Sequence, residues 1–460
     1  MNPPVLLADP TRKERRRPTR EGKTYFLRTF GCQMNEHDSE RIAGLFEADG
    51  MSAVGDYESA DVVFINTCTI RENADNRLYG HLGQLKQLKD AMPGMVLVVG
   101  GCAAQKDREI VRARAPWVDV VLGTHNLDRV IDLMDHAQEW GPITEIAEEL
   151  QGMPSDLPVK RETDHSAWVT IQVGCNNTCT FCIVPAVRGV EISRRPGDIV
   201  REVERLATDG VVEVTLLGQN VNTYGRDLAI DGHRRPIFAE LLRRVGEVEG
   251  IRRIRFTSPH PADFREDVAL AMAETAAVCE QLHLPLQSGS SRVLASMHRG
   301  YNIERYMSRL ELARRIIPDL AVSTDIIVGF PGETEEDFQM TLDVVRAARF
   351  DQAFMFQFSP RPGTDAALRV DDFVPAAEAR ERFERLLELQ SEISVERNQA
   401  QVGKRVEVLA EGPSKKDSSV ATTRTRGGRV VHVAGDFRPG TFFEVEITAA
   451  AKHHLLGSPT

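Results

Sequence analysis

The sequence predicts an α/β fold in three folded parts: an N-terminal α/β domain with a parallel sheet, a partial (β/α)6 barrel and a small C-terminal all-β barrel. Its 460 residues, 42% of them hydrophobic, exceed what one core usually sustains. Short β-rich runs alternate with helical stretches over most of the chain, which is typical of parallel sheets with crossover helices. Near residue 400 the pattern changes to short strands separated by Gly, Pro, Lys and Ser, which is typical of a small β-barrel.

The first domain is expected over residues 24–140. Residues 1–23, which contain several Pro and basic residues, are expected to form a disordered arm. The polar segment 141–165 contains three Pro and is expected to be a linker. The sheet of the first domain is predicted from four β-rich runs: TYFLRTF (24–30), DVVFINT (61–67), MVLVVG (95–100) and VDVVLG (118–123).

The second domain is expected over residues 166–398. A full barrel of this type has eight βα units, so six units predict an open-sided barrel whose gap admits something larger than a metabolite. Residues 375–399 are expected to form one long charged helix. The six predicted strands are WVTIQV (168–173), VEVTLL (212–217), RRIRFT (252–257), EQLHLPL (280–286), VSTDIIVGF (322–330) and AFMFQF (353–358).

The third domain is expected over residues 399–460. From residue 401 to the end it carries nine Lys or Arg against six acidic residues, whereas the whole chain has a net charge of -11. A local basic surface on an acidic chain indicates contact with a polyanion rather than indiscriminate coating of nucleic acid. The side chains predicted to meet phosphates are Lys415, Lys416, Arg424, Arg426 and Arg429.

The composition also predicts where the protein works. No run approaches the roughly 20 apolar residues of a membrane span, and the first twenty residues lack the apolar core of a secretory signal. We therefore expect a cytoplasmic protein without a membrane partner, and nothing in the sequence demands more than a monomer. In a reducing compartment, seven spaced cysteines favour metal binding or redox work over structural disulfides.

Three cysteines cluster in GCNNTCTFCIVP, directly after the first predicted barrel strand. They are called here the barrel trio: Cys175, Cys179 and Cys182. Structural zinc needs a fourth ligand, and the closest upstream histidine, His165, lies across a predicted strand. An iron-sulfur cluster with one open iron fits three thiolates better, and barrel active sites lie at the carboxyl ends of the strands. A zinc site and an unrelated iron-sulfur motif remain the alternatives.

Three further cysteines each follow a predicted strand of the first domain. They are called here the N-terminal trio: Cys32, Cys68 and Cys102. Loops at the carboxyl ends of parallel strands meet in one crevice, so these thiols are expected to converge. Gly or Thr beside each thiol suits a backbone that approaches a cluster closely. The alternative is that they are three small buried residues.

The barrel trio, with Phe181 before its third cysteine, resembles the signature of the radical S-adenosylmethionine enzymes. That resemblance implies a 4Fe-4S cluster whose open iron chelates S-adenosylmethionine. With GCQMNEHDSE, INTCTIRENA, RGVEISRRP, HLPLQSGS, MHRGYNIERY, TDIIVGFPGETEEDF and FSPRPGTDAA, the chain resembles the methylthiotransferases over residues 31–367. The third domain then resembles their RNA-binding TRAM module. Family members commonly have an aromatic residue after Pro185, where this chain has Ala186.

The resemblance implies a function. It is the addition of a methylthio group to C2 of N6-isopentenyladenosine next to the anticodon of a tRNA. Two 4Fe-4S clusters are implied, an auxiliary one on the N-terminal trio and a radical-generating one on the barrel trio. S-adenosylmethionine would be used twice, with electrons from a donor of flavodoxin or ferredoxin type. The alternatives are methylthiotransferases of a ribosomal protein or of threonylcarbamoyl-adenosine, and a non-catalytic metal-stabilised RNA-binding protein.

Other candidate residues lie at the ends of barrel strands. Gln219 and Asn220 are candidate cofactor or substrate contacts, with capping of the next helix as the alternative. Asp325 lies beside a glycine-rich turn near where the family binds the adenosine of its cofactor, although an ordinary turn would look the same. His283 is expected to pack in the barrel rather than to be a ligand, and Cys279 to be a core residue.

Overall fold

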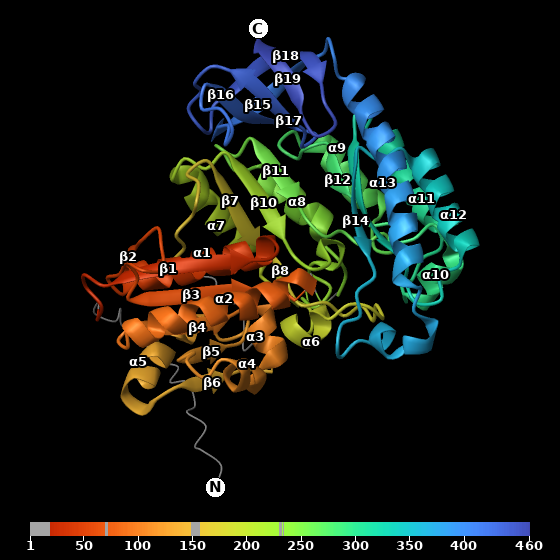
Figure 1. Cartoon of the computed structure of the whole chain (residues 1–460). Coiled ribbons are helices and arrows are strands. Elements are labelled where there is room, and N and C mark those ends of the chain that lie inside the picture. Colours follow the sequence, from red (N-terminus) through yellow and green to blue (C-terminus); the bar gives the residue numbers. More distant parts are fainter. Residues whose placement is uncertain (1–18, 70–71, 149–156, 230–231, 233) are drawn as a thin grey trace.

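The computed structural model describes residues 19–69, 72–148, 157–229, 232 and 234–460. Figure 1 shows the three predicted parts in chain order: the N-terminal domain, the strands and helices of the central barrel, and the C-terminal barrel. The C-terminal barrel and the N-terminal domain lie at different ends of the central barrel. The predicted fold class is therefore confirmed.

The N-terminal domain is a twisted sheet in which every strand pairing is parallel. Six strands of the described residues form it, in the order β2-β1-β3-β4-β5-β6. Every residue of β3 is buried, as expected for a strand with helices on both faces. The elements are β1 (Thr24–Phe30), α1 (Gln33–Ala48), β2 (Ser52–Ala53), β3 (Val62–Thr67), α2 (Glu72–Ala91), β4 (Val96–Gly100), α3 (Cys102–Asp107), α4 (Glu109–Arg114), β5 (Val120–Leu122), α5 (Val130–Trp140) and β6 (Ile143–Glu145).

Both boundaries of this domain differ in the structure from those predicted from the sequence. The edge strand β6 pairs with β5, so the domain includes residues 143–145, which were expected in the linker. At the other end, Arg20 is 8% exposed and forms ion pairs with Asp49 at 2.7 Å and Asp135 at 2.5 Å. The arm expected over residues 1–23 therefore does not extend past residue 18, and residues 1–18 lie outside the described residues.

The central barrel consists of two three-stranded parallel sheets, ordered β11-β10-β7 and β12-β13-β14. A bridge between Ile254 and Val278 joins them. In the described chain no pairing joins β7 to β14, so the predicted open side lies there. The elements are β7 (Ser166–Thr170), β8 (Gln172–Val173), α6 (Val184–Arg188), β9 (Ile192–Ser193), α7 (Pro196–Thr208), β10 (Glu213–Leu217), a 3-10 turn (Val221–Thr223), α8 (Phe238–Gly246), β11 (Arg253–Phe256), α9 (Glu266–Glu274), β12 (Gln281–His283), α10 (Ser291–Ser296), α11 (Ile303–Ile316), β13 (Ala321–Val328), α12 (Glu335–Ala348), β14 (Gln352–Gln357) and α13 (Ala376–Gln399).

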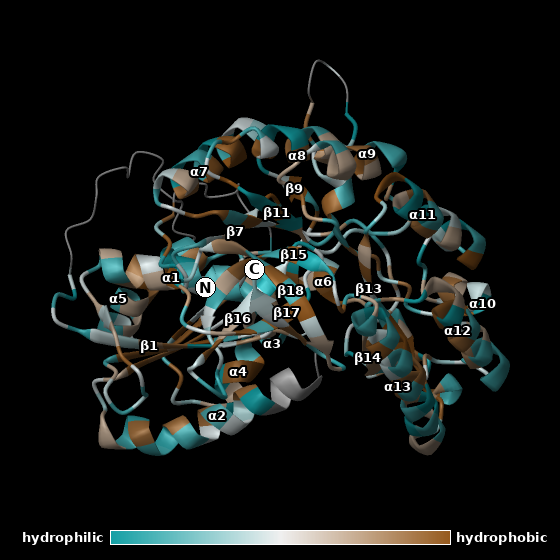
Figure 2. Ribbon diagram, turned by 90° about the horizontal axis from the view of Figure 1, so that it is seen from above, coloured by the Kyte–Doolittle hydropathy of each residue, from teal (hydrophilic) through white to brown (hydrophobic). Residues whose placement is uncertain are grey.

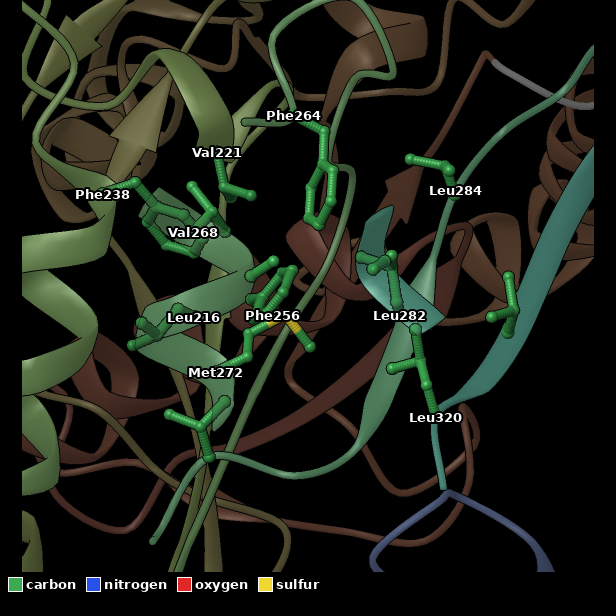
Figure 3. Close-up of a cluster of buried hydrophobic side chains, with 14 of the residues drawn as sticks. Leu216, Val221, Phe238, Phe256, Phe264, Val268, Met272, Leu282, Leu284 and Leu320 are labelled. Atoms are coloured by element: carbon green, nitrogen blue, oxygen red, sulfur yellow. The ribbon is translucent and has the colours of Figure 1, made fainter. Parts of the chain in front are cut away.

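The main hydrophobic core lies between the barrel strands and their helices. Figure 3 shows Leu216, Phe256 and Leu282 of the strands beside Phe238 and Val268 of α8 and α9. Figure 2 shows the helices as an arc around the strands. Because side chains alternate along a strand, the residues between these core positions face the interior of the barrel.

The C-terminal domain is a closed barrel with the strand order β15-β16-β17-β19-β18. It covers the starts of the central strands: Arg253, at the start of β11, donates to the carbonyl of Arg424 at 2.7 Å, and Arg255 donates to that of Thr425 at 2.9 Å. The domain therefore lies at the end of the central barrel that is farthest from the carboxyl ends of its strands. Its strands are β15 (Arg405–Pro413), β16 (Val420–Thr425), β17 (Val430–Ala434), β18 (Phe442–Ala450) and β19 (Leu455–Pro459).

Three of the five basic residues predicted to meet phosphates are engaged in ion pairs. Arg426 pairs with Glu280 at 2.8 Å, Arg429 with Asp351, and Arg424 with Glu411 at 2.5 Å. The pairs of Arg426 and Arg429 hold the C-terminal barrel on the central one, so these two arginines have a structural role; phosphate contact by the three arginines stays a prediction.

The two lysines of that set are exposed. Lys415 and Lys416 lie in the connection between β15 and β16, where a phosphate can reach them. No described helix has both the length and the apolar character that a membrane crossing requires.

Candidate active site

The N-terminal trio converges at the carboxyl edge of the first sheet. Cys32 precedes α1, and Cys102 is the first residue of α3. Their sulfur atoms both lie near Oδ1 of Asn35, at 3.5 Å and 3.9 Å. A hydrogen bond with Cys68 lowers the pKa of Cys32 to about 6. The structure thus brings together three thiols that are 36 and 34 residues apart in sequence, and their role as cluster ligands stays a prediction.

Glycines allow this convergence. A Cβ atom on Gly31 would lie 2.6 Å from Cβ of Cys68, and one on Gly101 would lie 2.2 Å from Oδ1 of Asn66. Gly101 also has φ of 89°, which favours glycine. A side chain at either position would push the loops that carry the thiols apart.

The barrel trio lies on the loop between β8 and α6. The backbone of Cys182 donates to the carbonyl of Cys179 at 3.0 Å, and that of Cys175 to the carbonyl of Gly189 at 3.1 Å. Burial raises the pKa of Cys175 to about 12 and that of Cys182 to about 11. These thiols become thiolates readily only where a metal centre compensates their charge.

The donor sets fit clusters better than single ions. In the part of the chain that the structure describes, no three His, Cys, Asp or Glu side chains converge as the ligands of one metal ion would. The thiolates of a cubane cluster each bind a different iron, so a set of three thiols can hold such a cluster. The alternative of structural zinc lacks this support, because zinc needs four ligands around one point.

The two trios are neighbours. Cys102 packs against Ile183, which precedes α6, and against Val187 of α6. The hydroxyl of Thr124, after β5, donates to the carbonyl of Val187 at 2.7 Å. The loop of the barrel trio and α6 therefore contact the carboxyl edge of the N-terminal sheet. Sequence reasoning placed each trio at strand ends but had no signal for their contact.

Gln219 and Asn220 lie at the carboxyl end of β10, where cofactor contacts were predicted. Asn220 is fully buried and donates to Asp263 at 2.9 Å, and it makes no side-chain capping bond to the turn that follows. Oδ1 of Asn220 and Oε1 of Gln219 have no hydrogen-bond partner among the described residues. Two buried acceptors without partners favour the cofactor or substrate role over capping.

The inner face of β12 and β13 carries Asp325 and His283. His283 Nε2 lies 3.2 Å from Oδ2 of Asp325, and its Nδ1 lies 3.0 Å from Oγ of Ser323. The side chains are 22% and 30% exposed, because they face the barrel interior rather than the helices. His283 thus lies on the inner face of the barrel, and the expectation that it is not a ligand stays a prediction. Cys279 is 1% exposed, which confirms it as a core residue.

An aromatic row on the same inner face was missed from the sequence. Phe354 and Phe356 of β14 are 42% and 39% exposed, and Phe354 lies edge-on to His283 at 6.0 Å between centroids. Phe358 continues the row and contacts Phe330. Phe330 in turn contacts Phe181 of the barrel-trio loop. The alternation in AFMFQF is the signal that could have revealed this row.

Ala186, the departure from the family pattern, is exposed on α6.

Comparison with known proteins gives the same three parts. The matching family models are described as uncharacterized protein family UPF0004 (residues 24–123), Radical SAM superfamily (residues 169–345) and TRAM domain (residues 399–460). A protein of Mycolicibacterium vanbaalenii named tRNA-2-methylthio-N(6)-dimethylallyladenosine synthase is 54% identical over 450 residues, which are 95% of this chain and 88% of that protein. The chain belongs to the tRNA-2-methylthio-N(6)-dimethylallyladenosine synthase family.

Another synthase of this name, from Mycobacterium bovis, is 56% identical over 451 residues, covering 96% of this chain and 87% of that protein. Membership of the synthase family does not favour the alternatives raised by the sequence. Among solved structures, the radical S-adenosylmethionine methyltransferase TsrM from Kitasatospora setae, with cobalamin and a 4Fe-4S cluster bound, has a TM-score of 0.54 at 15% identity. The matched region covers 76% of this chain and 77% of the TsrM chain, and the likeness shows a shared fold alone.

Proposed function

We propose that this protein is a radical S-adenosylmethionine methylthiotransferase. Its reaction is the addition of a methylthio group to C2 of N6-dimethylallyladenosine, next to the anticodon of a tRNA. The observation that carries the proposal is the contact between the two cysteine trios, through Cys102 and α6, in a chain of the synthase family. Sulfur insertion at an unactivated carbon needs both a radical source and a sulfur carrier, and neighbouring three-thiol sites supply a place for each.

The cysteines and the strand-end polar groups have separate roles. The barrel trio would hold the radical-generating 4Fe-4S cluster and the N-terminal trio the auxiliary 4Fe-4S cluster, each with one iron open. When bound, the clusters and S-adenosylmethionine supply the radical, the methyl group and the sulfur. Gln219, Asn220 and Asp325 would contact S-adenosylmethionine through the buried acceptors and the carboxylate on the inner face.

The aromatic row suits the base. A base in an anticodon loop must be splayed out before an enzyme reaches its C2 atom, and such bases bind beside aromatic side chains. Phe354 and Phe356 offer exposed apolar surface on β14, at the open side of the barrel. We assign them to the dimethylallyl group and the adenine ring, because exposed apolar surface is suited to an alkylated base.

The remaining partners follow from the surface and the chemistry. Lys415 and Lys416 on the C-terminal barrel would contact tRNA phosphates, which position the RNA without reading its sequence. Reduction of the clusters requires a donor of flavodoxin or ferredoxin type. We expect the protein to act as a monomer in the cytoplasm.

Iron and acid-labile sulfide content tests the two-cluster arrangement. Anaerobically reconstituted wild-type protein should hold about eight irons, and alanine substitution of either trio should leave about four. The two triple variants are each other's matched control, since each removes three thiols. About four irons in both the wild type and the N-terminal variant would mean that the N-terminal trio holds no cluster. That result would contradict the proposal that this trio holds the cluster that supplies sulfur. With two clusters established, methylthiolation of an isopentenylated tRNA is the direct assay.

A further inference from the structure

In each trio, one thiol is contacted by a buried arginine, and the two arginines are different residues. Nε of Arg188 donates to Sγ of Cys102 at 3.3 Å, and Nη1 of Arg299 donates to Sγ of Cys179 at 3.3 Å. Arg188 is 5% exposed and Arg299 is 7% exposed. Buried arginines require partners, and here a cysteine sulfur is one of them in both cases.

Arg188 crosses from one domain to the other. It is the last residue of α6, six residues after Cys182, but its side chain contacts residues of the N-terminal domain. There it forms an ion pair at 2.7 Å with Asp38 of α1, which is itself buried. The positive charge thus lies between a carboxylate on one side and the N-terminal trio on the other.

Arg299 has a different environment. Its Nε donates to the hydroxyl of Tyr301 at 3.2 Å, and that hydroxyl donates to the carbonyl of Pro285 at 2.8 Å. Within the described ranges Arg299 forms no ion pair with a carboxylate, so its charge is not offset as that of Arg188 is. The barrel trio therefore has a nearby cation without a counter-ion.

A fixed charge at this distance acts on the reduction potential. Reduction adds a negative charge to a cluster, and the potential depends on net charge, on hydrogen bonds to the sulfurs and on exposure to solvent. In a buried site a cation is screened far less than at the surface. Each arginine therefore stabilises the reduced form of the cluster whose thiolate it contacts.

We infer that Arg188 and Arg299 separately set the reduction potentials of the two clusters. Arg188 raises that of the auxiliary cluster on the N-terminal trio, and Arg299 raises that of the radical-generating cluster on the barrel trio. Because Asp38 offsets part of the charge of Arg188, loss of Arg299 causes the larger shift. This inference rests on the two-cluster arrangement proposed above.

The test uses full-length protein in two backgrounds, in which one trio is replaced by alanine so that a single cluster remains. Midpoint potentials are measured by an EPR-monitored redox titration, together with iron content. Arg188→Gln should lower the reduced-to-oxidised ratio of the auxiliary cluster at fixed ambient potential by at least tenfold, which is about 59 mV for a one-electron couple. Arg299→Gln should do the same, by a larger factor, to the other cluster only.

Conservative variants separate charge from structure. Arg188→Lys keeps the charge and should retain most of the potential, whereas Asp38→Asn should shift it in the opposite direction from Arg188→Gln. If Arg188→Gln loses its iron because Asp38 is left buried and unpaired, the double variant Asp38→Asn/Arg188→Gln is compared with Asp38→Asn alone, and the difference between their potentials measures the effect of the arginine charge.

Three results would overturn the inference. The first is an unchanged potential in Arg188→Gln or Arg299→Gln protein that still holds about four irons. The second is an equal shift of the potentials of both clusters by either variant. The third is a loss of iron that persists in the double variant. The last would make Arg188 a residue that holds the fold together. Wild-type protein without eight irons would instead refute the two-cluster proposal, so the two failures are distinguishable.

Discussion

Replacing Phe354 by alanine should reduce the preference for an alkylated base. A phenylalanine side chain has about 200 Å² of surface, and 42% of that of Phe354 is exposed, which leaves about 80 Å² for a ligand to cover. At about 25 cal/mol per Å², full coverage is worth about 2 kcal/mol, or roughly a 30-fold change in Kd. Phe356, 39% exposed, should give a similar loss.

The assay compares binding of two anticodon stem-loops, one with N6-dimethylallyladenosine and one with unmodified adenosine. Phe354→Ala and Phe356→Ala should each weaken binding of the alkylated RNA by up to about 30-fold and that of the unmodified RNA much less. Gln357→Ala is the matched control, because Gln357 lies on the same strand and, by alternation, on its other face. Equal losses for both RNAs, or no loss, would refute the assignment of the aromatic row to the alkyl group.

Three further predictions follow from the ion pairs and exposed cations. Lys415→Ala/Lys416→Ala should lower the slope of log K against log salt for tRNA binding by about two, and an unchanged slope in a filter-binding series would exclude both lysines as phosphate contacts. Asp351→Asn should destabilise the protein by about 3 kcal/mol, since Asp351 is 9% exposed and pairs with arginines of α13 and of the C-terminal barrel. Urea unfolding measures this change in the free energy of unfolding. A loss below about 0.5 kcal/mol would contradict the prediction. Burial raises the pKa of Glu333 from 4.5 to about 7, so the native state binds its proton more tightly and this group's contribution to stability falls as pH rises from about 4.5 to 7. Glu333→Gln should therefore flatten that part of a pH series of unfolding free energies, and parallel curves for the two proteins would show that Glu333 does not titrate in this window.

How well the sequence predicts secondary structure differs between elements. The predicted run 24–30 is β1 to the residue, and the predicted helix 375–399 is α13 within one residue. Periodicity and β-branched residues are local properties, so they can be read without tertiary information. The edge strand β6 has three residues and a mixed pattern, ITE, and it forms because β5 offers an unpaired edge. No local signal distinguishes such a strand from a linker.

The candidate site divides in the same way. The spacing of the barrel trio and the strand-end positions of the N-terminal trio could be predicted, because parallel strands direct their carboxyl ends to one edge. The engagement of Arg426 and Arg429 could not, since composition reports that an arginine is present but not which carboxylate lies opposite. Their role in joining the two barrels was missed for this reason.

By itself, the sequence determined the three domains, the two sets of three thiols and the resemblance to the methylthiotransferases. Only the tertiary structure placed the trios against each other, brought Arg188 from α6 to Cys102, and brought Arg299 to Cys179. It also placed Phe354 beside His283 on the inner face of the barrel. The physical reason is that strand and helix patterns arise from neighbours along the chain. The electrostatic environment of a thiol arises instead from charges that are distant in sequence and adjacent in the fold: Arg188 lies 86 residues from Cys102 and Arg299 lies 120 residues from Cys179.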